Sequence, residues 1–159
     1  MSFNNLKVEE QQYNLSSSSG ECLDILDNKD FDFTLDIPSE ISKVLKLTGS
    51  RAWEAAKETS DWDYICYPEV LEELLRWCET NEINYTRHIC KGSVYIKDSE
   101  NNIYNIIPLV KAEFDAWSFA TLMMRFISKR NYLVKFDFGD KSKVYGLFGL
   151  FKAIHRFIC

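Results

Sequence analysis

The pair Gly49-Ser50, followed after a spacer of ten residues by Asp61-Trp62-Asp63-Tyr64, is the stretch of sequence that decides the fold. Strand side chains alternate between two faces, so Asp61 and Asp63 share a face if this segment is a β-strand. Two neighbouring carboxylates disfavour each other's ionisation unless a cation lies between them. Carboxylate oxygens suit Mg²⁺, which completes its shell with water and substrate phosphates. The spacing therefore predicts a metal site formed by Asp61 and Asp63.

The Gly49-Ser50 turn supplies what such a metal site still lacks. Glycine lets the backbone come close to a phosphate, and N–H groups at the start of a following helix attract the anion. Ser50 would give backbone and hydroxyl contacts. Arg51 could reach a triphosphate, and it could equally be an exposed arginine of a first helical turn. Together, the two stretches predict a metal–triphosphate site.

These residues resemble the signature of the DNA polymerase β-like nucleotidyltransferase superfamily. That signature is a hydrophobic residue, Gly-Gly or Gly-Ser, a spacer, and then acid–hydrophobic–acid–hydrophobic. The chain is most similar to the small members, the minimal or antitoxin-like nucleotidyltransferases and similar proteins predicted in phages, over about residues 38–127. The resemblance implies a mixed sheet with Gly49-Ser50 at the end of its first strand and the acid pair on its second.

The resemblance also implies an activity and its cofactors. The protein would bind a nucleoside triphosphate with Mg²⁺ or Mn²⁺. It would transfer the nucleoside monophosphate to a hydroxyl on a small molecule, a protein or a nucleic-acid end. Cofactor contacts would come from Gly49, Ser50 and Arg51, and metal contacts from Asp61 and Asp63.

Active members of the superfamily use a third carboxylate on a later strand, and here Asn105 fills that position in the strand expected at 103–109. Asparagine can orient a hydroxyl or a metal-bound water, but it is neutral and cannot take a proton. Glu113 and Asp115 could replace the acid, or merely favour the start of their helix. Two main classes stay open: an active transferase, and a catalytically impaired interaction protein on the same fold, such as a phage-type inhibitor or an antitoxin-like partner. A plain binding module with an incidental acid pair is a third.

Length and composition set the frame for this site. The chain of 159 residues has room for one core, and its 46% hydrophobic and 14% aromatic content suits a packed protein. No apolar run is long enough to cross a bilayer, the start carries no signal segment, and the five scattered cysteines lack C-x-x-C spacing. We therefore expect a cytoplasmic protein without a membrane partner. Residues 111–159 hold nine Lys or Arg against four Asp or Glu, which a solvated helical face explains better than a nucleic-acid surface.

The hydrophobic pattern predicts an α+β protein with a mixed sheet, helices packed on it and a C-terminal helix. Residues 1–20 read as a flexible arm and 21–159 as a single domain. The last helix opens with Lys141, Lys143 and Tyr145, which suit a polar helix start or contacts to a base or phosphate. Strands are expected at 30–36, 44–47, 61–67, 84–89, 93–96, 103–107 and 132–138, and helices at 38–43, 51–57, 68–79, 112–129 and from 141.

Overall fold

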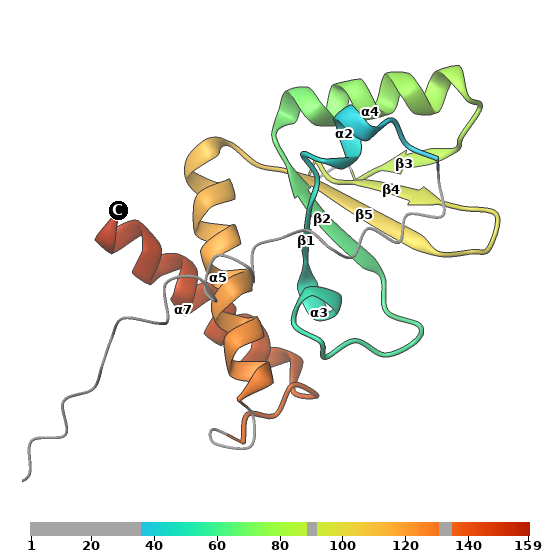
Figure 1. Ribbon diagram of the computed structural model, residues 1–159. Helices are drawn as coiled ribbons and strands as arrows, with labels where there is room; N and C mark the ends of the chain where they lie inside the picture. The colour runs from blue at the N-terminus through green and yellow to red at the C-terminus, as the bar shows by residue number, and fades with distance from the viewer. Residues whose placement is uncertain (1–35, 89–91, 131–134) are drawn as a thin grey trace, which may run out of the picture.

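A computed structural model describes residues 36–88, 92–130 and 135–159. The arm expected at 1–20 and nearly all of the strand expected at 30–36 lie outside these ranges. Within them the chain is α+β, with a mixed sheet, packed helices and a C-terminal helix (Figure 1). The predicted fold class is therefore confirmed. No helix in the described ranges has the length and apolarity that crossing a membrane requires.

Five strands form the sheet of the described chain, in the order β1-β2-β5-β4-β3. The central strands β2 and β5 are parallel, and every other neighbouring pair is antiparallel. Both central strands therefore end at the same edge of the sheet, and residues 63 and 105 stand side by side in register. The strand bounds are β1 Lys46–Thr48, β2 Trp62–Cys66, β3 Tyr85–Arg87, β4 Val94–Lys97 and β5 Ile103–Pro108.

One face of the sheet is covered by α4 (Pro68–Thr80), with the short helix α2 (Ser39–Ser42) beside it (Figure 1). Proline is well tolerated at the start of α4 because its missing N–H has no partner in a first turn. The leucines of α4 then recur at helical spacing and face the sheet. Tyr64 and Tyr104 are fully buried in this layer, so their strand neighbours Asp63 and Asn105 must point to the opposite face.

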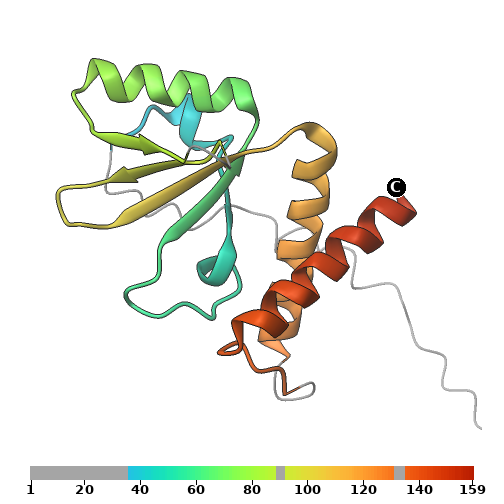
Figure 2. The same cartoon turned by 180° about the vertical axis from the view of Figure 1, so that it is seen from behind.

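Two long helices, α5 (Lys111–Lys129) and α7 (Lys141–Ile158), pack against each other beside the sheet (Figures 1 and 2). They enclose a second apolar cluster with the end of β1 and α3 (Gly49–Ala52). Asp140 caps α7 by accepting a hydrogen bond from the backbone N–H of Lys143, which satisfies one of the free donors of a first helical turn. The buried members of this cluster are Ala52, Trp53, Ala120, Met124, Val144 and Phe148.

The strands expected at 61–67 and 84–89 are shorter in the structure, at Trp62–Cys66 and Tyr85–Arg87, so Asp61 lies just outside its strand. Three other predicted elements differ more. The first strand is Lys46–Thr48 instead of 44–47, and the next helix begins at Gly49 instead of Arg51 and ends at Ala52 instead of Lys57. Glu54, with a φ of 60°, turns the chain out of the helix. Of the strand predicted at 132–138, residues 135–138 are irregular and end in a turn, and the rest lies outside the described ranges.

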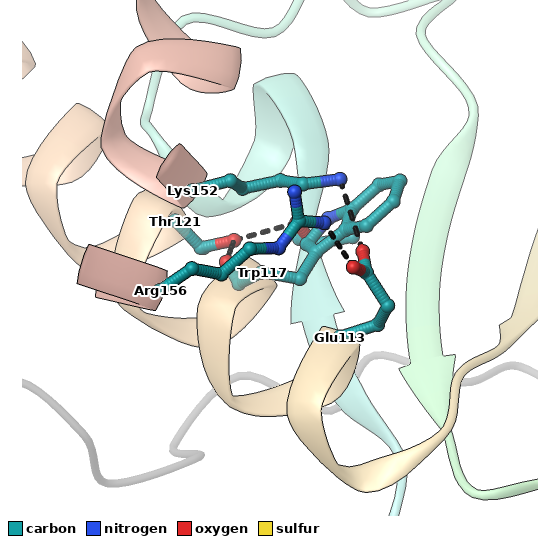
Figure 3. Close-up of polar contacts among 6 residues, drawn as sticks. Glu113, Trp117, Thr121, Lys152 and Arg156 are labelled. Atoms are coloured by element: carbon teal, nitrogen blue, oxygen red, sulfur yellow. Dashed lines mark hydrogen bonds and ion pairs between the residues drawn. The ribbon is translucent and has the colours of Figure 1, made fainter. Parts of the chain in front are cut away.

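Thr48 joins the sheet to α5. Its side chain is 1% exposed, and its Oγ1 accepts a hydrogen bond of 2.9 Å from Trp117 Nε1 and lies 2.7 Å from Thr121 Oγ1. Thr121 also donates to the Trp117 carbonyl, as Figure 3 shows. Because Thr48 directly precedes Gly49, these bonds fix where the sheet turns into α3.

We predict that Thr48→Val destabilises the protein by about 1–3 kcal/mol, because the half-buried Trp117 indole N–H and the buried Thr121 hydroxyl lose their bonds to Thr48 while the volume is nearly kept. The free energy of unfolding in urea measures this. Thr86→Val, on the exposed face of β3, is the matched control and should change stability by less than about 0.5 kcal/mol. Equal effects of the two substitutions would contradict the role given to Thr48.

Candidate functional site

The backbone of Gly49 lies directly against the carboxylate of Asp63. A Cβ on Gly49 would overlap Asp63 Oδ2 and lie 3.1 Å from Asp63 Cγ. Gly49 also has a φ of 70°, a conformation that L side chains rarely adopt. Two independent constraints therefore require glycine here. The predicted proximity of the Gly-Ser turn and the acid pair is present in the structure.

Asn105 lies beside Asp63 on the neighbouring strand. Its Nδ2 donates a hydrogen bond of 2.8 Å to Asp63 Oδ1. Its own Oδ1 is buried and has no hydrogen-bond partner among the described residues. Leaving a buried carbonyl oxygen unsatisfied is unfavourable. Since a half turn of the amide would place this oxygen against Asp63 Oδ1, a proton or cation between the two oxygens would satisfy both.

Burial raises the pKa of Asp63 above its ordinary value of 3.8, the Asn105 hydrogen bond opposes the rise, and the charge of Asp61 adds to it. Asp61 itself is exposed and directly precedes β2. The carboxylate of Asp61 is therefore better solvated than that of Asp63, and the two repel each other electrostatically. A cation between them would relieve the repulsion that their proximity creates.

Arg51 holds the loop that leads to Asp61. Its guanidinium donates to the carbonyl oxygens of Ser60 and Glu58 at 2.6–3.1 Å. The guanidinium carbon also lies 4.1 Å from the centre of the Trp62 ring. Trp62 packs on the α4 side of the sheet, opposite the acids, as its place between them in the sequence predicts. Arg51 is not among the residues that line the cleft described below, so its contacts make it a positioning residue.

A cleft of about 730 Å³ opens between the sheet and α7, and the predicted residues Gly49, Ser50, Asp61, Asp63 and Asn105 all line it. Its remaining walls are aromatic and basic. They come from β1, β5, the segment 53–60, α5, the turn before α7, and α7. The residues are Thr48, Trp53, Ala55, Lys57, Thr59, Ser60, Ile107, Trp117, Phe138, Gly139, Lys141, Val144, Tyr145, Phe148, Gly149 and Lys152.

Lys152 is the cleft residue that sequence reasoning missed. It sits in the middle of α7, where its ammonium forms an ion pair of 3.3 Å with Glu113 and lies 4.5 Å from the centre of the Trp117 ring. Arg156 pairs with the same carboxylate (Figure 3). Burial raises the pKa of Glu113, but Arg156 and Lys152 outweigh this effect and lower it below its ordinary value. Only its place one turn after Phe148 could have indicated that Lys152 faces the core side of α7.

The structure does not bring the two candidate replacement acids into the cleft. Glu113 is engaged by Lys152 and Arg156, and Asp115 pairs with Lys111 at 2.9 Å. Lys143 pairs with Asp140 at the start of α7, whereas Lys141 and Tyr145 do line the cleft. In the described ranges, no three His, Cys, Asp or Glu side chains gather as metal ligands would. A cation at this site would therefore depend on two aspartates and an amide oxygen.

Comparisons of the chain with models of protein families, with curated proteins and with solved structures find no match. A function for this chain therefore has to follow from the geometry of the cleft. That geometry combines a glycine-bearing turn, two carboxylates, an unsatisfied amide oxygen and basic and aromatic walls.

We predict that Gly49→Ala destabilises the fold more than Gly92→Ala. Both glycines have a positive φ, and an alanine Cβ there costs about 1–2 kcal/mol. At Gly92 the nearest atom to such a Cβ, Pro108 Cγ, is 3.9 Å away. At Gly49 the overlap with Asp63 adds about 1–3 kcal/mol. Urea unfolding of both variants measures the difference, and equal losses would show that the close contact with Asp63 is absent in solution.

Proposed function

We propose that the protein binds a nucleoside triphosphate together with Mg²⁺ or Mn²⁺ in this cleft and transfers the nucleoside monophosphate to a hydroxyl acceptor. The observation that carries the proposal is the contact between the Gly49 backbone and the Asp63 carboxylate, with Asp61 and Asn105 in the same cleft. Gly49 has no side chain and lies next to the paired carboxylates. A phosphate bound to their metal ion could therefore lie against the backbone of this turn.

Asp61 and Asp63 would hold the cation, and Asn105 Oδ1 would add a third oxygen after the amide rotates. Mg²⁺ usually takes one or two protein carboxylates and leaves its other positions to water and phosphate oxygens. When bound, the ion supplies charge neutralisation for the triphosphate. The unsatisfied oxygen of Asn105 and the raised pKa of the half-buried Asp63 both support this assignment, because each marks a group that a cation would stabilise.

The basic and aromatic walls support a nucleotide as the ligand. Lys57, Lys141 and Lys152 line the cleft, and their charges favour a polyanion over a neutral ligand. Tyr145 lines the same cleft and is 67% exposed, so a base can stack on its ring. Ser50 would contact phosphate through its hydroxyl and backbone N–H. Arg51 would act indirectly, because it holds the loop that carries Asp61.

In the transfer step, the acceptor oxygen forms a bond to the α-phosphorus while the bond to the pyrophosphate breaks. The acceptor loses its proton during this exchange. Asn105 has no basic atom with which to take that proton, so it passes to water. In the cation-bound site Asn105 Oδ1 would instead contact the cation, in place of the hydrogen bond of 2.8 Å that Nδ2 otherwise donates to Asp63. This chemistry predicts a slow transferase.

The second candidate function is a catalytically impaired interaction protein, either a phage-type inhibitor or an antitoxin-like partner. It is favoured by one observation, the neutral Asn105 where a third carboxylate would stand, directly opposite Asp63 in register. On this alternative the cleft still binds nucleotide, but no nucleotidyl product forms.

Calorimetric titration with a nucleoside triphosphate and Mg²⁺ tests the binding site. We predict that Asp63→Asn weakens the Mg²⁺-dependent affinity by more than about tenfold, since even outer-shell changes at metal sites cost about 10–100-fold. Asp61→Asn should act in the same direction. Asp115→Asn is the matched control, because Asp115 pairs with Lys111 and does not line the cleft. Unchanged binding by the Asp63 variant would reject the site.

Labelled nucleoside triphosphates, incubated with the protein and cell extract, separate the two functions. We predict a labelled product with the wild-type chain and about 10²–10⁴-fold faster formation with Asn105→Asp, because the carboxylate can act as a general base. The Asp63→Asn variant should form no product. If neither wild type nor Asn105→Asp yields product while nucleotide binding persists, the interaction protein is the correct function.

A further inference from the structure

One side of α7 is apolar and exposed. Leu150 is 54% exposed and Phe157 95%. Residues 146, 150, 153 and 157 are spaced by four, three and four positions, which places them in one stripe along the helix. This outer stripe, defined as Gly146, Leu150, Ala153 and Phe157, carries no charged side chain. A solvated helix normally places charged and polar residues on such a face.

The charged residues of α7 near the stripe are turned elsewhere. Lys152 and Arg156 both pair with Glu113 of α5 (Figure 3), and Lys143 pairs with Asp140 at the first turn. Their side chains are therefore not positioned to cover Leu150 or Phe157. The stripe stays uncharged over about three helical turns.

Gly146 has no explanation within the described part of the fold. It lies inside a helix, where glycine costs about 1 kcal/mol relative to alanine, and its φ is not positive. A Cβ at this position would meet no described atom within 4 Å. Neither backbone conformation nor packing within the described chain therefore requires glycine. Close approach of another chain would require it.

We infer that the outer stripe of α7 is a dimer interface, on which the same helix of a second copy packs in an antiparallel direction. A two-fold axis through the middle of the stripe places Phe157 against the partner's Gly146 and Leu150 against the partner's Ala153. Each large exposed side chain then meets a small residue, and the reverse contact follows by symmetry. The stripe is complementary to itself, which selects a second copy as the occupant.

The contact area fits a weak, reversible dimer. Covering an aromatic side chain removes about 150–250 Å² from water, so the two Phe157 rings supply part of the roughly 1,000 Å² that a specific interface needs. Both copies of Leu150 and the small residues between them add to it. The inference does not depend on the proposed nucleotide site, because it uses the opposite side of α7.

Sedimentation equilibrium of the full chain over a concentration series tests the interface. We expect a monomer–dimer equilibrium, with dimerisation weakened at least about tenfold by Leu150→Glu and by Phe157→Ala. Val110→Ser is the matched control, because Val110 is 64% exposed but lies outside α7. A wild-type chain that stays monomeric at all concentrations would overturn the inference. If that monomeric wild type also loses thermal stability on Leu150→Glu, residues of the same chain cover the stripe instead of a second copy.

A swap of large and small residues tests the antiparallel register. Gly146→Phe alone should block dimerisation, because the added ring meets the partner's Phe157. The double variant Gly146→Phe/Phe157→Gly should regain dimerisation, because each ring again faces a glycine. Circular dichroism checks that both variants keep their helix content. A double variant that associates no better than Gly146→Phe would show that the stripe does not pair in this way.

Discussion

The contact between the Gly49 backbone and the Asp63 carboxylate is the constraint on which the rest of the site depends. It needs a residue without a side chain, at a positive φ, at the point where β1 ends. The flanking residues hold the turn in place from two sides. Thr48 is bonded to α5 through Trp117, and Arg51 is bonded to the loop before β2. Four consecutive residues thus join the sheet, a helix and the loop that carries Asp61.

The electrostatics of the site follow from placing Asp63 on a buried strand next to a second acid. Burial and the charge of Asp61 both disfavour the ionised carboxylate. Asn105 reduces this cost because it donates a hydrogen bond where a third carboxylate would add repulsion. An asparagine at this position also supplies no general base. With Asn105 in place of a third carboxylate, the site costs less free energy to fold without a cation, but it is poorer at taking a proton. The stability of the site and its proposed slow chemistry therefore have the same cause.

Much of the fold could be predicted from local patterns. The helices at 68–80, 111–129 and 141–158 were predicted to within a residue or so, since their apolar residues recur at helical spacing. Strand alternation predicted that Asp63 and Trp62 face opposite sides. It did not predict that the helix after the turn would begin at Gly49 and end at Ala52, because that depends on the positive φ of Gly49 and Glu54. The roles of Arg51 and Lys152 depend on contacts with residues seven or more positions away in the sequence, which local patterns do not specify.

The central claim is that Asp63 is a half-buried carboxylate that a cation would stabilise. The effect of Asp63 on stability tests that claim most directly. A folded-state pKa above 3.8 means that the folded protein binds more protons than the unfolded chain, so stability falls as pH rises from 3.8 through the raised pKa. Urea unfolding of wild type and Asp63→Asn, without divalent ions, should show the variant more stable at neutral pH and the difference vanishing below pH 3.8. Adding Mg²⁺ should then stabilise the wild type alone, in proportion to occupancy. A variant that is less stable at neutral pH without divalent ions, or Mg²⁺ that changes neither protein, would contradict the account.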